Sequence, residues 1–230
     1  VGYATEFQEV TADSGKFTSI DLGGYLAAAL VLIGKSVENN SEINVVDFVI
    51  SKIAEKVSAF IEEQLLSGTG SSQAQGILNC ANTVTAANND KITVDDLIEL
   101  QGAVKQAYQQ GACWTMNNDT FTAIKKIKDT TGRMMIQTDA SKAFPYTLLG
   151  KPVYLSDAMP KIAANAKTVL YGNYNALAVN FRENINVQIL REKYATQHAL
   201  GVICWFEFDS KVIDEQKCAV LVQAAAPSTG

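Results

Sequence analysis

Hydrophobic residues recur every three or four positions between residues 44 and 66, which is the strongest pattern in the sequence. This spacing places them on one face of a helix, with charged side chains on the other faces. Asn44 and Asp47 have the spacing of an N-cap and the third helical residue, and Gly68 is expected to end the helix. At a rise of about 1.5 Å per residue, the predicted helix is about 30 Å long.

Two segments before this helix have the residues of extended chain. Residues 25–33 are a continuous apolar run (YLAAALVLI), which is typical of a strand buried on both faces. Residues 1–22 mix strand-forming residues with a turn at residues 13–16, and a hairpin of this kind buries little surface without a partner. We therefore expect the hairpin to pack on another surface, of its own chain or of a second one.

A second helix is expected to begin at Thr93, with Asp96 at the third helical position. The residues of its predicted face are Leu97, Ile98, Gln101, Val104 and Tyr108. The segment before it, residues 79–90, is small and polar, which is typical of a linker or of a crossing between domains.

A third helix is predicted after a short strand at residues 113–116, and Asn118 or Asp119 is expected to cap it. The apolar residues of this helix are Phe121, Ile124 and Ile127. A turn at residues 149–152 leads into a strand, and further extended segments are predicted at residues 169–179, 186–189, 202–208 and 219–222. Because helices and strands are intermixed without a regular βαβ repeat, the expected fold class is α+β rather than doubly wound.

The composition is that of a globular protein, since hydrophobic residues make up 47% and charged residues 19% of the 230 residues. A chain of this length can bury a large core without disulfides or metals. Lys and Arg number 19 and Asp and Glu number 24, which gives a net charge of −5. This charge argues against a protein whose whole surface binds nucleic acid, although it is compatible with a local basic patch.

The four cysteines are Cys80, Cys113, Cys204 and Cys218. None of them has a second cysteine or a histidine at the close spacing that zinc sites usually have. The sequence therefore predicts no metal site, and it predicts free thiols in a reducing cytoplasm.

The sequence shows no membrane span or signal peptide. The longest apolar run, residues 25–33, is shorter than the about 20 residues that a bilayer span needs. The N-terminus lacks the charged and then apolar pattern of a signal peptide. The chain begins with Val1, so we expect that a preceding segment was removed or lies outside this sequence.

Three patterns that suggest chemistry have simpler interpretations. Residues 67–72 (SGTGSS) lack the Gly-Lys-Ser/Thr ending of a P-loop and follow a helix, so they are expected to end it rather than to bind phosphate. His198 is the only histidine, and no GxSxG nucleophile motif accompanies it. The adjacent pair Glu62 and Glu63 lies on a predicted helix, where neighbouring side chains point apart. No catalytic, metal-binding or cofactor-binding residue is therefore assigned.

Lys125, Lys126, Lys128 and Arg133 form a basic cluster at the end of the third predicted helix. Such a cluster is compatible with binding to nucleic acid or to the acidic edge of a neighbouring protein. The interpretation that we favour is a solvated helix end.

Five short motifs occur in an order that resembles the tailed-phage major capsid family. The long helix ends in EEQLLSGTG (residues 62–70), followed by GIL (residues 76–78), and this is similar to the end of the spine helix in that family. WTMN (residues 114–117), KDTTGR (residues 128–133) and LLGKPV (residues 148–153) resemble later segments of the family in the same order. The resemblance covers nearly the whole chain.

This resemblance implies a capsid-type fold, which encapsulins share, with a peripheral (P) domain, an axial (A) domain and an extended hairpin called the E-loop. Residues 1–22 would be part of the E-loop, which reaches over a neighbouring subunit. Residues 23–78 and 186–230 would form the P domain, with the long helix and antiparallel strands. Residues 79–185 would form the A domain, whose loops meet at the centre of each pentamer or hexamer.

Some members of this family join their subunits by an isopeptide bond between an E-loop lysine and a P-domain asparagine, assisted by a glutamate. Aligned on Phe17 and on residues 186–188, the corresponding positions are Ser19, Asn184 and Gln188. Only the asparagine matches. The resemblance therefore implies no crosslink of this kind, because amide formation needs the amine of the lysine.

The function implied by the resemblance is that of a non-enzymatic major capsid subunit. It would self-assemble in the bacterial host cytoplasm into the pentamers and hexamers of an icosahedral phage or prophage head. Double-stranded DNA, held by weak non-specific contacts, would be the content of the virion, and scaffold, portal and decoration proteins would be further partners, with no membrane and no cofactor. The candidate inter-subunit contacts are Phe17, Ser19, Glu62, Glu63, Lys125, Lys128, Arg133, Asn184 and Gln188.

Two alternatives remain open from the sequence. The first is the shell subunit of an encapsulin-like nanocompartment, which has the same fold and encloses protein cargo. The second, more remote, is a small hydrolase that uses His198.

Overall fold

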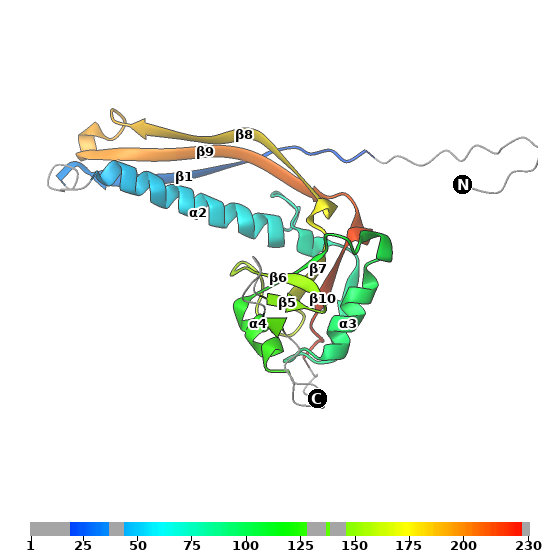
Figure 1. Cartoon of the computed structure of the whole chain (residues 1–230). Coiled ribbons are helices and arrows are strands. Elements are labelled where there is room, and N and C mark those ends of the chain that lie inside the picture. Colours follow the sequence, from blue (N-terminus) through cyan, green and yellow to red (C-terminus); the bar gives the residue numbers. More distant parts are fainter. Residues whose placement is uncertain (1–18, 37–43, 128–136, 139–145, 227–230) are drawn as a thin grey trace, which may run out of the picture.

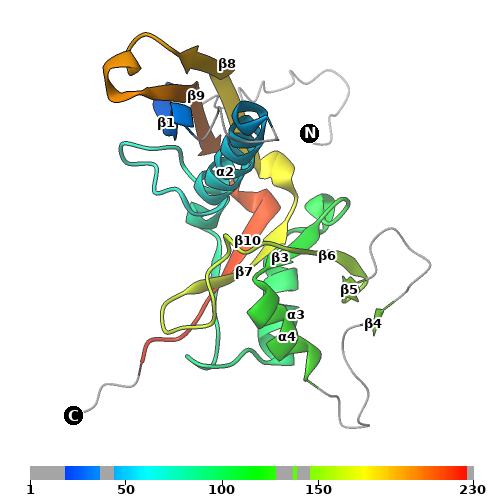
Figure 2. The ribbon, with the colours of Figure 1, turned by 90° about the vertical axis from the view of Figure 1, so that its left-hand side faces the viewer.

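The computed structural model describes residues 19–36, 44–127, 137–138 and 146–226. This part of the chain forms an elongated unit and a compact unit that meet at one end (Figure 1). The elongated unit is a three-stranded sheet with a long helix along one face, and the compact unit is a seven-stranded sheet with two shorter helices (Figure 2). The predicted α+β class is confirmed.

The elongated sheet consists of β1 (Tyr25–Gly34), β9 (Ala199–Val212) and β8 (Leu177–Leu190), in the order β1-β9-β8 and with antiparallel neighbours. The strands predicted at residues 186–189 and 202–208 are confirmed. Both are longer than their alternating patterns indicate, since β8 and β9 each have 14 residues.

The helix α2 (Val45–Ser67) confirms the prediction for residues 44–66. Its N-cap is Asn44, whose side chain accepts a hydrogen bond from the backbone N–H of Asp47 at 3.4 Å. Gly68 ends the helix, and a Cβ there would lie 2.3 Å from the carbonyl oxygen of Ala74, so no larger residue fits. The glycine-rich segment thus closes a helix, as predicted.

The expectation that residues 25–33 are buried on both faces is wrong, although the strand itself is confirmed. Alternate residues such as Ala27 and Ala29 pack in the core beneath α2, whereas Leu26 is 61% exposed. Burial on both faces requires a second covering layer. In the described part of the chain, α2 covers one face of this sheet only (Figure 1).

The compact unit is built on one sheet with the strand order β2-β10-β7-β3-β6-β5-β4. Its strands are β2 (Thr83–Thr85), β3 (Cys113–Met116), β4 (Gln137–Thr138), β5 (Tyr146–Leu148), β6 (Lys151–Leu155), β7 (Lys167–Gly172) and β10 (Cys218–Val222). The predicted strand at residues 113–116 is the central β3, and all of its residues are buried. The core beside it contains Trp114, which packs on Tyr171 with ring centroids 4.4 Å apart.

The helix α3 (Val94–Ala103) begins as predicted, with a capping box. Thr93 Oγ1 accepts from the Asp96 backbone N–H at 3.3 Å, and a carboxylate oxygen of Asp96 accepts from the Thr93 backbone N–H at 2.7 Å. Its predicted face needs correction, because Ile98 is 51% exposed and the helix ends before Val104 and Tyr108. Leu100 takes the place of Ile98 in the core, since the sheet lies against a face rotated from the predicted one.

The helix α4 (Asn118–Lys125) begins earlier than predicted, because neither Asn118 nor Asp119 is its cap. Its N-cap is Asn117, whose side chain accepts from the backbone N–H of Asp119 at 3.0 Å. Phe121 and Ile124 are buried, in agreement with the predicted face, whereas Ile127 lies beyond the end of the helix and is half-buried. The 3₁₀ helices are η1 (Ile77–Asn79), η2 (Gln106–Tyr108), η3 (Tyr174–Ala176), η4 (Ala195–Gln197) and η5 (Glu215–Lys217).

Three connections join the two units: α2 to β2, β7 to β8, and β9 to β10. We call the small core where these connections meet the junction core. Its buried residues are Leu66, Ile77, Leu78, Cys80, Met159, Leu170, Ala176, Cys218 and Val220.

The division between the two sheets differs in two places from the domain boundaries that the sequence suggests. Residues 177–185 belong to β8 of the elongated sheet, and β10 pairs with β2 and β7 of the compact sheet. The partners of β10 are distant in sequence, so local patterns do not indicate to which sheet it belongs. The assignment of P and A domains stays a prediction, and predicted E-loop residues 1–18 lie outside the described residues.

Candidate subunit interface

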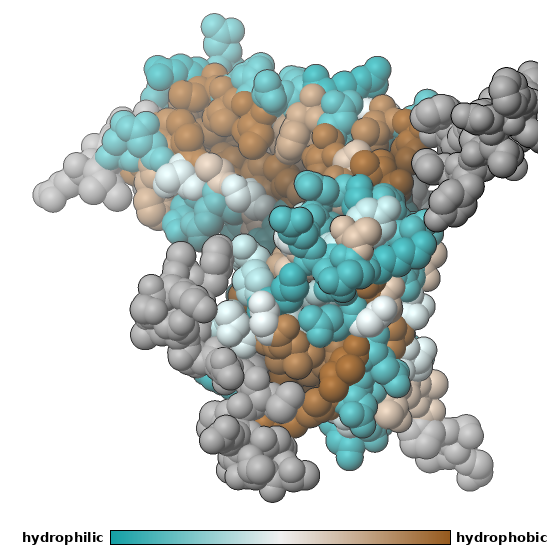
Figure 3. Space-filling view, turned by 45° about the vertical axis from the view of Figure 1, so that its right-hand side comes forward, coloured by the Kyte–Doolittle hydropathy of each residue, from teal (hydrophilic) through white to brown (hydrophobic). Residues whose placement is uncertain are grey.

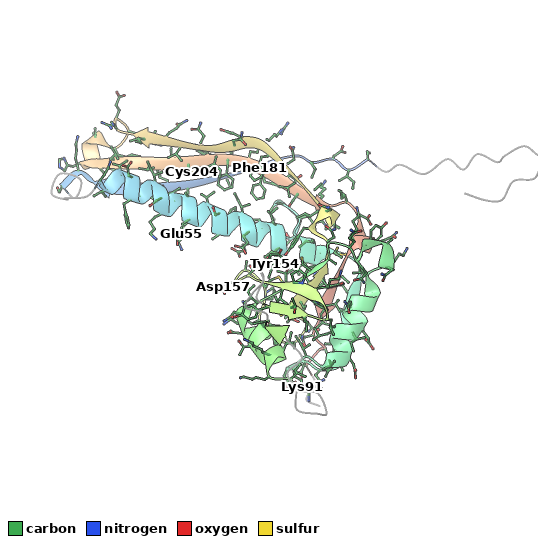
Figure 4. The ribbon with its side chains drawn as sticks, in the orientation of Figure 1. Glu55, Lys91, Tyr154, Asp157, Phe181 and Cys204 are labelled. Atoms are coloured by element: carbon green, nitrogen blue, oxygen red, sulfur yellow. The ribbon has the colours of Figure 1, made fainter. Side chains whose placement is uncertain are left out.

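An apolar strip runs along β8 on the side of the sheet that faces α2. It consists of Val179, Phe181, Val187 and Ile189, which are between 38% and 43% exposed. We call these residues the β8 strip. Figure 3 shows hydrophobic side chains gathered along the elongated unit, and Figure 4 shows Phe181 on the side of the sheet towards α2.

The β8 strip is exposed because α2 packs beneath the other two strands. The register pairs Phe181 with Phe208, Val187 with Cys204, and Ile189 with Val202, and each of these β9 partners is buried in the core beneath α2. The strip therefore continues the face that α2 covers, but it lies beyond the helix.

A row of aromatic rings connects the strip to the helix. The centroids of Phe181 and Phe208 lie 5.7 Å apart, those of Phe208 and Phe206 lie 5.9 Å apart, and Phe206 meets Phe60 of α2 at 6.2 Å. Phe181 and Phe60 are exposed at the two ends of this row. Large apolar side chains that are exposed next to one another are typical of an interaction surface, whereas single exposed apolar residues are common on any protein.

A groove of about 650 Å³ continues the strip towards the compact unit. Its apolar walls come from the second half of α2, from the first residues of β8 and from the end of β6. The apolar side chains that line it are Ile61, Leu65, Leu66, Tyr154, Leu155, Leu177 and Val179.

Polar groups also line this groove. Ser156 Oγ donates to a carboxylate oxygen of Glu62 at 2.6 Å, which connects the compact unit to α2. The hydroxyls of Thr115 and Tyr174 share a hydrogen bond of 2.5 Å, and burial raises the pKa of Tyr174 to about 12. The Tyr174 hydroxyl therefore stays protonated at neutral pH and takes part in the groove through a hydrogen bond.

The opposite face of the elongated sheet carries a second apolar surface. Leu26, Leu30 and Leu32 alternate with the core residues of β1 and are all exposed. Trp205 and Ile203 of β9 lie in register with residues of this face and are half-buried. We call this surface the far face.

The elongated sheet also has two long edges. β1 and β8 are its outer strands, and among the described residues no strand pairs with their outer sides. An open edge offers backbone N–H and C=O groups to another chain. Two apolar surfaces and two edges thus lie on the same unit, which is the arrangement expected of a subunit that contacts several neighbours.

The predicted contact residues that the structure describes do not form one site. Ser19, Asn184 and Gln188 are exposed, the last two on β8, and Glu62 and Glu63 are exposed on α2. Phe17, Lys128 and Arg133 lie outside the described residues.

Lys125 is held by its own chain. Its Nζ lies 5.4 Å from the ring centroid of Phe121 and 4.8 Å from that of Tyr146. This contact over two aromatic rings stabilises the end of α4. Of the predicted cluster, Lys126 is exposed beside it.

His198 is exposed in the turn between β8 and β9, where it adopts a left-handed backbone conformation with φ of 49°. The four cysteines are free and buried. Within the described ranges, no group of three or more His, Cys, Asp or Glu side chains is arranged to hold a metal ion. No helix of those ranges has both the length and the hydropathy of a membrane span.

Sequence reasoning missed the β8 strip, the groove and the far face as contact surfaces. Apolar and polar residues alternate over residues 186–189 of β8, but this pattern normally indicates that the apolar side of a strand is buried. No signal in the sequence indicates that α2 stops short of β8, because the lateral position of a helix on a sheet is set by tertiary packing.

A comparison with family models matches residues 1–222 to the phage capsid family. No curated protein sequence matches the chain.

Comparison with solved structures gives similar folds over most of the chain. The capsid of a native GTA particle has a TM-score of 0.85 at 21% identity, over 98% of this chain and 81% of that chain. A structure of Microbacterium phage Oxtober96 has a TM-score of 0.70 at 13% identity, over 88% of this chain and 73% of the other. The holo-SrpI encapsulin complex from Synechococcus elongatus PCC 7942 has a TM-score of 0.67 at 17% identity, over 87% of this chain and 73% of the other. At these identities the comparison establishes the shared fold.

Proposed function

Because the chain belongs to the phage capsid family, we propose that it is the structural subunit of an icosahedral virion shell and that copies of it associate through the elongated unit. Membership of this family indicates a structural rather than a catalytic role.

The observation that carries this proposal is the exposure of apolar side chains on both sides of the elongated sheet. The β8 strip lies on one side, with Phe181 43% exposed, and the far face lies on the other, with Leu30 47% exposed. Burying such side chains contributes about 25 cal/mol for each Å² of apolar surface. A closed symmetric shell covers these surfaces in every subunit and repeats each small contact many times.

The finer arrangement follows the family pattern. Pentamers and hexamers of the subunit would form the shell in the host cytoplasm, with the compact unit at the centre of each capsomer. The content would be double-stranded DNA, and the net charge of −5 suits weak, non-specific contact with phosphate groups rather than a tight complex. Scaffold, portal and decoration proteins are the further expected partners.

A second candidate function is the shell of a protein-filled nanocompartment. The similarity of the fold to the encapsulin favours it. The two functions differ in particle content, because a phage head encloses DNA and a nanocompartment encloses protein.

Electron microscopy of the expressed protein tests the proposal. We expect closed shells, and shells recovered from infected or induced cells are expected to contain nuclease-protected DNA. Shells filled with protein would support the second candidate, whereas a chain that stays a small soluble species at every concentration would contradict both.

We expect no covalent crosslink between subunits. Ser19 and Gln188 are exposed where the crosslinked members have a lysine and a glutamate, and a serine hydroxyl cannot form the isopeptide bond with Asn184. Denaturing gels of purified shells are therefore expected to show one monomer band. A ladder of high-mass bands that survives boiling with reductant would contradict this prediction.

A further inference from the structure

Two of the four cysteines meet in the junction core. Cys80 directly follows η1, and Cys218 is the first residue of β10. The Sγ of Cys80 lies 3.5 Å from the carbonyl oxygen of Cys218 and 3.5 Å from that of Glu215. The Cys80 thiol thus donates to the backbone of Cys218, and both side chains are buried in the same small core.

Neighbouring groups fix the backbone around Cys218. Asn82 Nδ2 donates to the carbonyl oxygen of Cys218 at 3.1 Å, and the backbone N–H of Val220 donates to the carbonyl oxygen of Asn82 at 3.0 Å. On the other side, β7 packs closely against Cys218. A Cβ on Gly172 of β7 would lie 2.6 Å from the Cys218 Cα. The backbone of Cys218 is therefore fixed by Asn82 on one side and by β7 on the other.

The two thiols differ chemically from the other two. Contact with Cys218 lowers the pKa of the Cys80 thiol, whereas the hydrogen bond with Cys80 and burial raise the pKa of Cys218. Burial alone raises the pKa of Cys204, and it raises that of Cys113 to about 11. Of the four thiols, that of Cys80 is the one whose pKa is lowered, and it shares a buried core with a second thiol.

We propose that Cys80 and Cys218 form a modification site at which a peroxide converts the two thiols into an intramolecular disulfide. The Cys80 thiolate attacks one oxygen of hydrogen peroxide, and hydroxide leaves and takes up a proton to give water and a sulfenic acid. The Cys218 sulfur then attacks the Sγ of Cys80 and expels a second water. Two thiols and one peroxide thus give one disulfide and two waters.

This disulfide would link two of the three chain segments that join the elongated unit to the compact unit. Cys80 lies on the connection from α2 to β2, and Cys218 lies where the connection from β9 enters β10. The two residues are 138 positions apart in sequence, so the bond closes a long loop of the unfolded chain. The inference concerns the folded subunit and holds whichever shell the subunit builds. In a virion, the bond would form after the particle leaves the reducing cytoplasm.

Treatment of the full-length chain with hydrogen peroxide, followed by alkylation and peptide mass spectrometry without reductant, tests the proposal. We expect a linked pair of peptides that contain Cys80 and Cys218 and weigh less by two hydrogen atoms. Because the disulfide restricts the unfolded chain, the melting temperature of the oxidised protein is expected to rise by about 10 °C and to fall back with reductant. Both side chains are buried, so the reaction is expected to be slower than that of an exposed thiol.

A matched control is the Cys113→Ser, Cys204→Ser double variant, which keeps only the proposed pair. It is expected to show the same linked peptides and the same reversible shift, whereas Cys80→Ser loses both and leaves Cys218 free to be alkylated. The proposal is overturned if Cys80 and Cys218 stay reduced in the folded protein while peroxide oxidises the new thiol of a Ser58→Cys variant, since Ser58 is exposed. A link through Cys113 or Cys204 instead would overturn it as well.

Discussion

Trp114→Ala is expected to lower the free energy of unfolding by about 3–5 kcal/mol. The indole of Trp114 is fully buried in the centre of the compact sheet and packs on Tyr171. Its Nε1 donates to the carbonyl oxygen of Leu148 at 2.9 Å, so the substitution leaves both a cavity and a buried acceptor without its donor. Urea denaturation followed by circular dichroism measures the change.

The chain provides its own control for this prediction. Trp205, the second tryptophan, is only half-buried on the far face, so Trp205→Ala is expected to cost less than half as much. Trp114→Phe keeps most of the ring and loses the hydrogen bond, and it should give a value between the two. Equal losses for the Trp114→Ala and Trp205→Ala variants would show that the compact core does not depend on Trp114 as described.

Val187→Glu is expected to prevent shell assembly while leaving the subunit folded. Val187 is exposed in the β8 strip of the isolated chain, so a glutamate there remains hydrated and changes the free energy of unfolding by less than about 1 kcal/mol. In an apolar interface, however, the same carboxylate loses its water without a partner, which costs several kcal/mol at every copy of the contact. Sedimentation and electron microscopy should show folded subunits or small oligomers and no shells.

Asn175→Glu makes the same change of charge at an exposed position of η3 that lies outside the strip. This variant is expected to assemble like the wild type. If Val187→Glu also forms shells at the wild-type concentration, the β8 strip is not a subunit contact. Ile189→Glu, two residues further along the same face, then decides whether that result holds for the whole strip.

The elements that the sequence predicts well are those whose start and end signals are local. The helix α2 has its cap at Asn44 and its stop at Gly68, and α3 has both residues of its capping box within four positions. These groups act through hydrogen bonds to the adjacent turn, so they act in the same way whatever packs around them. Asn117 was missed as the cap of α4 only because its neighbours, Asn118 and Asp119, are also good capping residues.

Burial and sheet membership are predicted less well, because they depend on partners that are distant in sequence. β1 is strand-like by composition, but its exposure is decided by α2, which covers one face and not the other. β10 follows β9 after a short connection, yet it crosses to the compact sheet and pairs with β7. No local pattern distinguishes this crossing from a simple hairpin.

The candidate interface was beyond prediction from the sequence for a related reason. The motif resemblance indicated a subunit that contacts copies of itself, but it pointed to polar positions such as Asn184 and Gln188. Both are exposed on β8, and the apolar residues between and beside them form the more extensive surface. The exposure of an apolar side chain becomes clear only when the packing around it is known.

The register of β8 against β9 shifts twice, between Phe181 and Glu183 and between Glu183 and Asn186. Extra residues of this kind bend a strand and increase its twist, so the edge of β8 is divided into two short regular stretches rather than one long one. A straight, apolar edge is a template on which identical chains stack into fibrils. The subunits of a shell expose their contact surfaces in solution until they assemble. The bent edge of β8 would reduce fibril formation by the unassembled subunits during this time.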